Sequence, residues 1–415
     1  MKILLYSLNF SPELTGIGKF SGEMATYLAQ AGQDVHVVTA PPYYPEWKLA
    51  KGYSKWLYSV DKEPLAGAYT PSGSLCVTRC PIWIPQHPSG AKRLLHLASF
   101  ALTSLPATIR EAFWRPDVVV VIEPPLFCTP ATLLISILSR SQSWLHIQDF
   151  EVDAAFELGL IKANWLRKTV GAVERWIMKR FDRVSTISNG MLSKLSDKDV
   201  PAASRLLFPN WVDTQQIFPL PPSDSLRHEL GISSEHVVLL YSGNMGMKQG
   251  LELVIAVAKR LQDHPSIKFL MCGHGAAMET LKVQAESLAN MRWIPLQPLS
   301  KLNRLLNSAD IHLLPQKAGA ADLVMPSKLT GMLASGKAVV ATALEGTEVW
   351  DVVNGRGLNV PPGDVDAFHH AILTLAENKS LRDDLGAAGR SYAERFLQKD
   401  VILSQFLKEL EGIRI

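Results

Sequence analysis

The stretch Asp310–Thr342, DIHLLPQKAGAADLVMPSKLTGMLASGKAVVAT, predicts a strand, a loop, a helix and a second strand. Ile311–Leu314 is a short apolar run, as a buried parallel strand requires. A loop rich in Gly and Ala follows over Gln316–Val324. Pro326 suits the first turn of the next helix, because the N–H that it lacks needs no partner there.

The end of this predicted helix also has a clear signal. Gly336 is expected to stop it just after Ser335, and Ala338–Thr342 then forms the second strand. Such a unit directs free backbone N–H groups and a positive helix end toward the carboxyl edge of a parallel sheet, which suits a phosphate. An ordinary βαβ unit without a ligand has the same shape, so the rest of the chain must decide.

Length and composition narrow the classes of protein. A chain of 415 residues is long enough for two domains, and 47% apolar with 20% charged residues describes a globular protein. A net charge of +3, without a basic arm, argues against a nucleic-acid partner. Four cysteines are too few for a disulfide framework, which favours a reducing compartment. Cys76 and Cys80 lie close in sequence, but no further Cys or His completes a metal set.

Two apolar segments bear on membrane contact. The first residues, MKILLYSLNF, lead directly into a structured pattern and do not resemble a signal peptide. The longest uncharged stretch, Leu94–Ile109, is shorter than the ~20 residues that span a bilayer. We expect a helix buried in the first domain; the alternative is a segment dipping into one membrane face. The residues that favour the alternative flank the stretch: Trp83, Lys92, Arg93, Trp114 and Arg115.

The chain opens with a Rossmann-like pattern. Lys2–Leu8 predicts a buried strand, Gly16 and Gly18 a turn, Phe20–Ala31 a helix and Val35–Thr39 a second strand. TGIG is not the full dinucleotide fingerprint, and no acid follows at the ribose position, so a hydride-transfer cofactor is not expected. The remaining function of the loop is to let a phosphate or sugar approach the backbone closely.

Two segments of the first half are candidates for substrate contact. The irregular region from residue 41 to 88 contains PPYYPEW, where Tyr43 and Tyr44 could stack on a sugar ring or equally cap a core. The strand Trp144–Ile147 is followed by polar side chains at its carboxyl end, where open α/β sheets hold ligands. These side chains are Gln148, Asp149, Glu151 and Asp153, and Asp149 is the first candidate because it follows the strand most closely.

The segment Asn164–Arg183 predicts an amphipathic helix with a strong positive bias. A solvated helix face is the simpler interpretation. The functional alternative is contact with an anionic membrane surface or an anionic lipid-linked substrate. The cations are Arg167, Lys168, Arg175, Lys179, Arg180 and Arg183.

The pattern of strands and helices then restarts. Val237–Tyr241 predicts a strand that leads into SGNMGMKQG, where Lys248 could neutralise a diphosphate, and Lys268–Met271 is followed by CGHG. We therefore predict an α/β protein of two Rossmann-like domains with parallel sheets facing across a cleft. The first domain covers residues 1–199 and the second 200–397, and a C-terminal helix over 398–415 packs back on the first.

Together these motifs resemble the retaining family 4 of GT-B glycosyltransferases. The resemblance is carried by SPELTGIGKFSGEM, HIQDFE, FPNWVD, YSGNMGMKQG, CGHG and MPSKLTGMLASGKAVVAT, in order over nearly the whole chain. More narrowly, TAPPYYPEW, RCPIWIP and LHIQDFEVDA are similar to the WcaI-type transferases of colanic acid, an exopolysaccharide. That resemblance implies transfer of a sugar, with fucose from GDP-fucose as the best candidate, to an undecaprenyl-diphosphate-linked saccharide.

The resemblance also implies roles for individual residues. The helix that starts at Pro326 directs its N–H groups at the β-phosphate of the donor, and Asp149 lies near the reacting carbon or the acceptor hydroxyl. The predicted catalytic residues are Asp149, Lys248 and Asp322. The predicted donor-binding residues are Gly16, Gly18, Gly243, Asn244, Lys248, Gly273, Gly275, Pro326, Ser327 and Lys328. The predicted acceptor-side residues are Gln148, Glu151, Tyr43 and Tyr44.

The chain departs from the family pattern at two places. Family members carry two Glu residues eight positions apart, and here Leu323 and Gly331 occupy those positions, which leaves Asp322 or Lys328 as substitutes. Gln148 stands where many relatives have a His.

The expected chemistry follows from the same residues. Without a DxD-like acidic cluster, we expect no metal and no other cofactor, with cations and N–H dipoles stabilising the leaving diphosphate. A peripheral location on the inner, cytoplasmic face of the plasma membrane is expected. The alternatives are a sugar-nucleotide epimerase on the same fold and a catalytically silent nucleotide-sugar-binding subunit, the latter suggested by the missing Glu pair.

Overall fold

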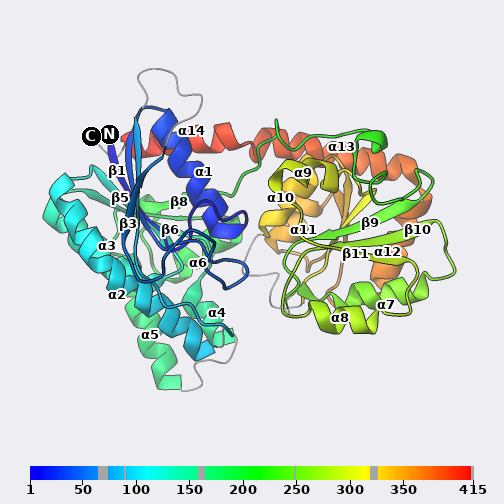
Figure 1. Ribbon diagram of the computed structural model, residues 1–415, viewed down its shortest axis with the longest axis horizontal. Coiled ribbons are helices and arrows are strands. Elements are labelled where there is room, and N and C mark those ends of the chain that lie inside the picture. The colour runs from blue at the N-terminus through cyan, green and yellow to red at the C-terminus, as the bar shows by residue number, and fades with distance from the viewer. Residues whose placement is uncertain (64–72, 88–89, 158–163, 247–248, 318–325, 413–415) are drawn as a thin grey trace. The chain divides into compact units, whose positions relative to one another are not determined.

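The computed structural model describes residues 1–63, 73–87, 90–157, 164–246, 249–317 and 326–412 (Figure 1). The chain folds as two compact units. Unit 1 consists of Met1–Pro209 with Leu403–Ile415, and unit 2 of Asn210–Ile402. Each is an α/β unit with its own sheet, as the sequence predicts.

Unit 1 is built on an eight-stranded sheet of order β3-β4-β2-β1-β5-β6-β7-β8. Its strand pairs are parallel except at the β3 edge, where β3 runs antiparallel to β4. The strands are β1 Lys2–Tyr6, β2 Asp34–Thr39, β3 Ser59–Lys62, β4 Ser74–Arg79, β5 Val118–Glu123, β6 Gln142–Ile147, β7 Arg183–Thr186 and β8 Arg205–Leu207.

Helices alternate with these strands, as a parallel sheet requires. The central strand β5 is buried along its whole length. The helices of unit 1 are α1 Gly16–Gln30, α2 Gly90–Trp114, α3 Thr129–Ser139, α4 Glu151–Glu157, α5 Asn164–Met178, α6 Asn189–Asp197 and α14 Lys399–Gly412, with short 3-10 turns at Leu126–Cys128 and Ala202–Ser204.

Unit 2 contains a fully parallel six-stranded sheet of order β11-β10-β9-β12-β13-β14. Its strands are β9 Val237–Ser242, β10 Ile267–Cys272, β11 Met291–Ile294, β12 Ile311–Leu314, β13 Ala338–Thr342 and β14 Gly357–Val360. Its helices are α7 Glu252–Arg260, α8 Met278–Gln284, α9 Leu299–Leu306, α10 Ser327–Ala334, α11 Glu348–Val353, α12 Val365–Glu377 and α13 Lys379–Phe396, with a 3-10 turn at Pro222–Asp224.

The stretch that predicted this architecture folds as expected. Both strands have the predicted bounds, and all residues of β12 and β13 are buried. Pro326 is the N-cap residue of α10, and Gly336 follows the helix with φ +69°, a conformation that favours glycine. Much of the predicted loop before α10 lies outside the described residues.

Three local predictions were wrong. Helix α1 begins at Gly16, so Gly16 and Gly18 lie in its first turn and not in a preceding turn. The region predicted as irregular contains β3 and β4, which extend the sheet beyond β2. Helix α5 ends at Met178 and not at Arg183. Asp182 lies beyond the helix, where it accepts hydrogen bonds from the N–H and Oγ of Ser143, both at 2.8 Å.

Helix α2 contains the long uncharged stretch. One side of α2 is buried, including His96, Phe100 and Ser104, as expected for a helix of this unit. Its other side exposes large apolar side chains such as Leu102 and Phe113. Among the described helices, none is both long and apolar enough to cross a bilayer.

Helix α14 is held in unit 1 by an aromatic cluster. The ring of Phe406 stacks on Phe208 with centroids 4.2 Å apart and meets Trp144 edge-on at 4.9 Å. Trp144 is fully buried, and its Nε1–H donates to Ser185 Oγ at 2.8 Å. The last helix therefore completes the core beside β6 and β8.

Phe406→Ala is expected to lower the free energy of unfolding by about 3 kcal/mol, because it removes a buried ring and leaves a cavity. The matched control is Lys408→Ala on the exposed side of the same helix, which should change stability by less than about 0.5 kcal/mol. Denaturant unfolding of both variants measures the difference. Equal stability of the two would contradict a structural role for this cluster.

Candidate active site

In unit 2 the loops after β9 and β10 touch through their backbones. Gly243 and Gly273 have φ values of +146° and +150°, which L side chains rarely adopt. A Cβ atom at Gly273 would lie 1.9 Å from the carbonyl oxygen of Gly243. The two loops therefore require glycine at this contact, which lies at the carboxyl edge of the sheet, where open α/β sheets bind ligands.

The neighbouring residues fix the same loops. A Cβ atom at Gly275 would lie 2.6 Å from Asn244 Oδ1 and 2.5 Å from the Met245 carbonyl oxygen. The Tyr241 hydroxyl donates to the Asn244 carbonyl at 2.5 Å, and the Met245 N–H donates to the His274 carbonyl at 2.9 Å. The predicted donor-binding residues Gly243, Asn244, Gly273 and Gly275 thus lie together.

Lys328 is brought to this group by the first turn of α10. Its Nζ lies 4.3 Å from the centroid of the Tyr241 ring, a cation–π contact. Its Cδ would be 3.4 Å from a Cβ atom at Gly243. Burial lowers the pKa of Lys328 to about 7, because the charged ammonium loses water. A cation, the N-terminal end of α10 and two glycine loops therefore converge at one edge of the unit 2 sheet.

In unit 1 the loop after β1 is organised by Glu13, which the sequence interpretation missed. Its Oε1 accepts from the N–H groups of Tyr43 and Tyr44, both at 3.0 Å, and its Oε2 accepts from Asn9 Nδ2 at 2.9 Å. Burial raises the pKa of Glu13. A Cβ atom at Gly18 would lie 2.6 Å from Glu13 Cβ, so glycine is required for this approach. The sequence signal that could have identified Glu13 is a single acid in a glycine-rich turn that follows a strand.

The two tyrosines of PPYYPEW have different surroundings. Tyr43 is buried, and its hydroxyl bonds His96 Nε2 at 2.8 Å. Burial lowers the pKa of His96, which keeps the imidazole neutral. Tyr44 is partly exposed, and its Cε1 would be 4.0 Å from a Cβ atom at Gly16. Of the two interpretations left open, Tyr43 matches core capping, whereas Tyr44 lies beside Gly16 and stays a candidate for stacking on a sugar ring.

The polar residues after β6 also differ in how far their side chains are buried. Gln148 is buried, with its side-chain amide 2.8 Å from His146 Nε2, and burial lowers the pKa of His146 to about 3. Asp149 is partly exposed at the carboxyl end of β6. Glu151 turns inward, where its Oε2 accepts from the Leu126 N–H at 2.8 Å and burial raises its pKa. Asp149 therefore stays the candidate for substrate contact among these three.

A group of largely buried charged side chains lies near the end of β5, and the sequence analysis did not predict it. Lys198 Nζ lies 2.6 Å from Glu174 and 3.0 Å from Asp153. Glu123 is fully buried at the end of β5, and burial together with the Glu174 charge raises its pKa well above the usual value. Glu123 is therefore uncharged over a wider pH range than an exposed carboxyl group. Lys198, the C-cap residue of α6, therefore links α4 to α5.

Three predicted positions lie outside the described residues, namely Lys248, Asp322 and Leu323. Gly331 is described and lies on α10, where it offers no side chain to a ligand. Ser327 is exposed in the first turn of α10 behind the N-cap Pro326. The described part of the predicted donor site therefore consists of backbone groups, Asn244 and Lys328.

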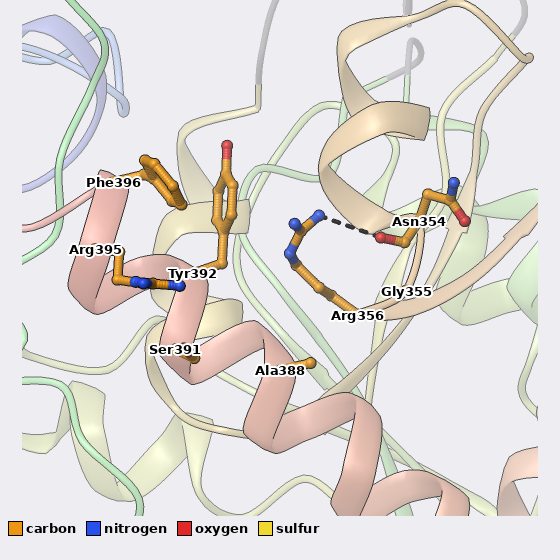
Figure 2. Close-up of a pocket in the computed structure, with 8 residues that line it drawn as sticks. All are labelled: Asn354, Gly355, Arg356, Ala388, Ser391, Tyr392, Arg395 and Phe396. Atoms are coloured by element: carbon orange, nitrogen blue, oxygen red, sulfur yellow. Dashed lines mark hydrogen bonds between the residues drawn. The ribbon is translucent and has the colours of Figure 1, made fainter.

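A small pocket of unit 2 lies at the opposite edge of the sheet (Figure 2). Asn354, Gly355 and Arg356 immediately precede β14, so the pocket is at the amino edge, away from the glycine loops. Arg356 Nη1 donates to the carbonyls of Val352 at 2.9 Å and Asn354 at 3.1 Å, and its guanidinium stacks on Tyr392. These contacts hold the end of α11 and do not extend the donor site.

Comparison with known proteins agrees with this arrangement. Residues 222–392 match the family model described as glycosyl transferases group 1, and residues 15–211 match the glycosyl transferase 4-like domain. The fold is GT-B, and both family models are those of glycosyltransferases. The chain belongs to this glycosyltransferase family, since it is 41% identical to the colanic acid biosynthesis glycosyl transferase WcaI of Escherichia coli K12, over 99% of this chain and 100% of the relative.

Solved structures share the fold at low identity. Sucrose-phosphate synthase from Thermosynechococcus elongatus superposes with a TM-score of 0.74 at 16% identity, covering 99% of this chain and 98% of the other. HepE of Anabaena, solved in complex with UDP and glucose, gives 0.71 at 14% identity, covering 99% of this chain and 100% of HepE. These likenesses establish the two-domain fold.

Gly273→Ala is expected to disrupt the loop contact of the donor site, because the new Cβ atom collides with the Gly243 carbonyl. We expect a loss of about 2 kcal/mol or more in the free energy of unfolding, together with much weaker nucleotide binding. Gly363→Ala is the matched control, since Gly363 has φ +83° but no atom within 4 Å of its Cβ position. It should show only the backbone strain, about 1 kcal/mol, and normal binding. Similar binding defects in both variants would contradict the close approach as the cause.

Proposed function

We propose that the protein transfers fucose from GDP-fucose to an undecaprenyl-diphosphate-linked saccharide during bacterial exopolysaccharide assembly. The support for colanic acid as the polymer is the 41% identity to WcaI. The choice of fucose and of a lipid-linked acceptor rests on the motif resemblance. The observation that carries the reaction class is the convergence of two glycine loops, the α10 N-terminus and Lys328 at one sheet edge.

The proposed chemistry uses this edge to stabilise the leaving group. As the bond between the sugar C1 and the diphosphate oxygen breaks, negative charge grows on the diphosphate. The Lys328 ammonium and the N–H groups at the start of α10 are the groups proposed to stabilise that charge without a metal, supported by their position beside the glycine loops. The acceptor oxygen attacks C1 from the same face, and its proton passes to the leaving phosphate. Configuration is then retained.

Asp149 is proposed to orient the acceptor hydroxyl or to stabilise charge at the sugar carbon. It follows β6 at the carboxyl edge of unit 1 and is partly exposed. Tyr44 and Gly16 are proposed to contact the sugars beside it, within the loop pair that Glu13 ties together. Lys248 and Asp322 remain candidates for the diphosphate and the sugar hydroxyls.

Lys328 makes donor binding pH-dependent. Its pKa of about 7 in the free protein means that the ammonium is deprotonated as the pH rises above neutrality. A bound diphosphate favours the charged form and raises that pKa, so binding above pH 7 takes up a proton. The affinity for a nucleoside diphosphate should therefore fall as the pH rises from about 7 to 9, by up to about tenfold per unit.

Lys328→Gln should weaken nucleoside diphosphate binding by about 10- to 100-fold at pH 7, because a charge-assisted contact is lost. Lys328→Arg keeps a cation whose pKa is above about 12, so its affinity should stay nearly constant from about pH 7 to 9. Calorimetric titration at several pH values measures both effects. Wild-type affinity in Lys328→Gln, or a pH profile of Lys328→Arg that follows the wild type, would remove Lys328 from diphosphate binding.

Incubation with GDP-fucose and a lipid-diphosphate saccharide tests the reaction itself. We expect nucleotide release that requires the acceptor, an α- or β-linked product matching the donor configuration, and no loss of activity on chelation of metal ions. An epimerised nucleotide sugar without acceptor would instead support the epimerase. Tight binding without turnover would support a silent subunit. A larger rise of melting temperature with another nucleotide than with GDP would change the assigned donor.

We propose a peripheral location on the inner face of the plasma membrane, where a lipid-linked acceptor is available. Helix α5 supports this location through its exposed rings Trp165 and Trp176 and through a run of cations on the helix and directly after it: Arg167, Lys168 and Arg175, then Lys179 and Arg180. Such a helix is suited to an anionic headgroup layer.

A further inference from the structure

Helix α2 carries a continuous apolar ridge that faces solvent. Leu95, Leu102 and Ile109 follow one another at intervals of seven residues, and Phe113 lies one turn further. Spacings of seven and four residues place these side chains on one line along the helix. Leu102 is 72% exposed and Phe113 is 85% exposed. Burial of this line would remove unfavourable apolar surface from water.

Helix α3 packs against α2 and extends the ridge into a broader surface. Ile137 is 75% exposed and Leu138 is 59% exposed. We use the name α2–α3 face for Leu95, Leu102, Ile109, Phe113, Ile137 and Leu138. A contiguous apolar surface of this kind on a globular protein marks an interaction site.

Aromatic residues with polar handles border the α2–α3 face. The Tyr58 hydroxyl donates to the Thr103 carbonyl of α2 at 2.5 Å, which fixes the exposed segment containing Trp56 beside that helix. The Trp83 N–H donates to Ser99 Oγ at 3.1 Å, and the Trp83 side chain is partly exposed. Trp and Tyr in such positions favour the boundary between headgroups and acyl chains.

The exposed charges of α2 and α3 are of one sign. Helices α2 and α3 contain a single acid, Glu111, which is buried and bonded to His36 at 2.7 Å. The exposed charges on these helices and at their ends are the cations Lys92, Arg93, Arg110, Arg115 and Arg140. An apolar face bordered by cations complements an anionic lipid surface. In a self-paired dimer two such borders would repel each other.

We propose that the α2–α3 face inserts into the headgroup boundary of an anionic bilayer and is the surface by which this protein docks to the membrane. The apolar ridge enters the acyl boundary, the border cations pair with lipid phosphates, and Trp56, Tyr58 and Trp83 lie at the interface. Helix α5 supplies long-range attraction, whereas α2 and α3 supply the apolar burial. The proposal deepens the proposed function because it names the surface that meets the lipid-linked acceptor's membrane.

Vesicle flotation of the whole protein tests the docking surface. Leu102→Ser combined with Ile137→Ser removes two inserted side chains without adding charge, and both residues are exposed, so the fold should be kept. We expect the wild type to bind phosphatidylglycerol-containing vesicles and the double variant to bind roughly 100-fold more weakly. The matched control is Val283→Ser on α8 of unit 2, which is 74% exposed and should bind like the wild type. Quenching of tryptophan fluorescence by brominated lipids should accompany wild-type binding.

The opposite results have distinct meanings. Wild-type vesicle binding by the double variant would overturn the assignment of this face. A wild-type dimer that the double variant breaks, without vesicle binding, would show that a second copy covers the face. Vesicle binding that depends on Leu102 and Ile137 but is not accompanied by sugar transfer would overturn the proposed function and leave the docking surface intact. Circular dichroism and melting temperature of all variants confirm that they fold.

Discussion

The close contact between the loops of Gly243 and Gly273 is the constraint on which the donor side depends. No side chain fits there, since the Cβ position at Gly273 is 1.9 Å from a carbonyl oxygen. Strands β9 and β10 pair in register up to Ser242 and Cys272, which delivers both loops to the same place. The surface at this edge is therefore formed by backbone atoms, held in place by the hydrogen bond from Tyr241 to Asn244. A ligand can bind against it without displacing side chains.

Lys328 adds a cationic side chain beside these loops, which suits an anion. Burying an ammonium beside the Tyr241 ring is unfavourable, and the lowered pKa of about 7 expresses this. The unfolded chain holds its lysine proton up to about pH 10.4, so this group makes the folded state more stable as the pH rises through that interval. At neutral pH the folded protein bears part of this destabilisation, and an anion bound beside the ammonium would relieve it. Gly331 on α10 offers no carboxylate at this edge, and Lys328 on the same helix carries a cation.

The sequence was sufficient where one segment determines its own structure. The apolar runs of β12 and β13 and the stop at Gly336 could be located to the residue, because burial on both faces and a left-handed turn leave a local signature. Residues whose roles depend on distant partners could not be assigned in this way. Tyr43 and Tyr44 are adjacent and identical in type, yet His96 from α2 separates a buried ring from an accessible one. Helix α1 starts at Gly16 against local propensity. The missing side chain at Gly18 leaves the space that Glu13 occupies.

The buried and exposed sides of helix α2 have different surroundings. Its buried side presents His96, which bonds Tyr43, and Glu13 then ties Tyr43 and Tyr44 to the loop after β1. Its exposed side carries Leu102 and Phe113. The buried side of α2 therefore positions the loop of Tyr43 and Tyr44 through a chain of hydrogen bonds, while its other side exposes apolar side chains to solvent. Helix α2 has 25 residues, so its length is not what distinguishes it from a membrane-spanning helix; its buried side carries polar residues, among them His96 and Ser104, which are turned into the protein.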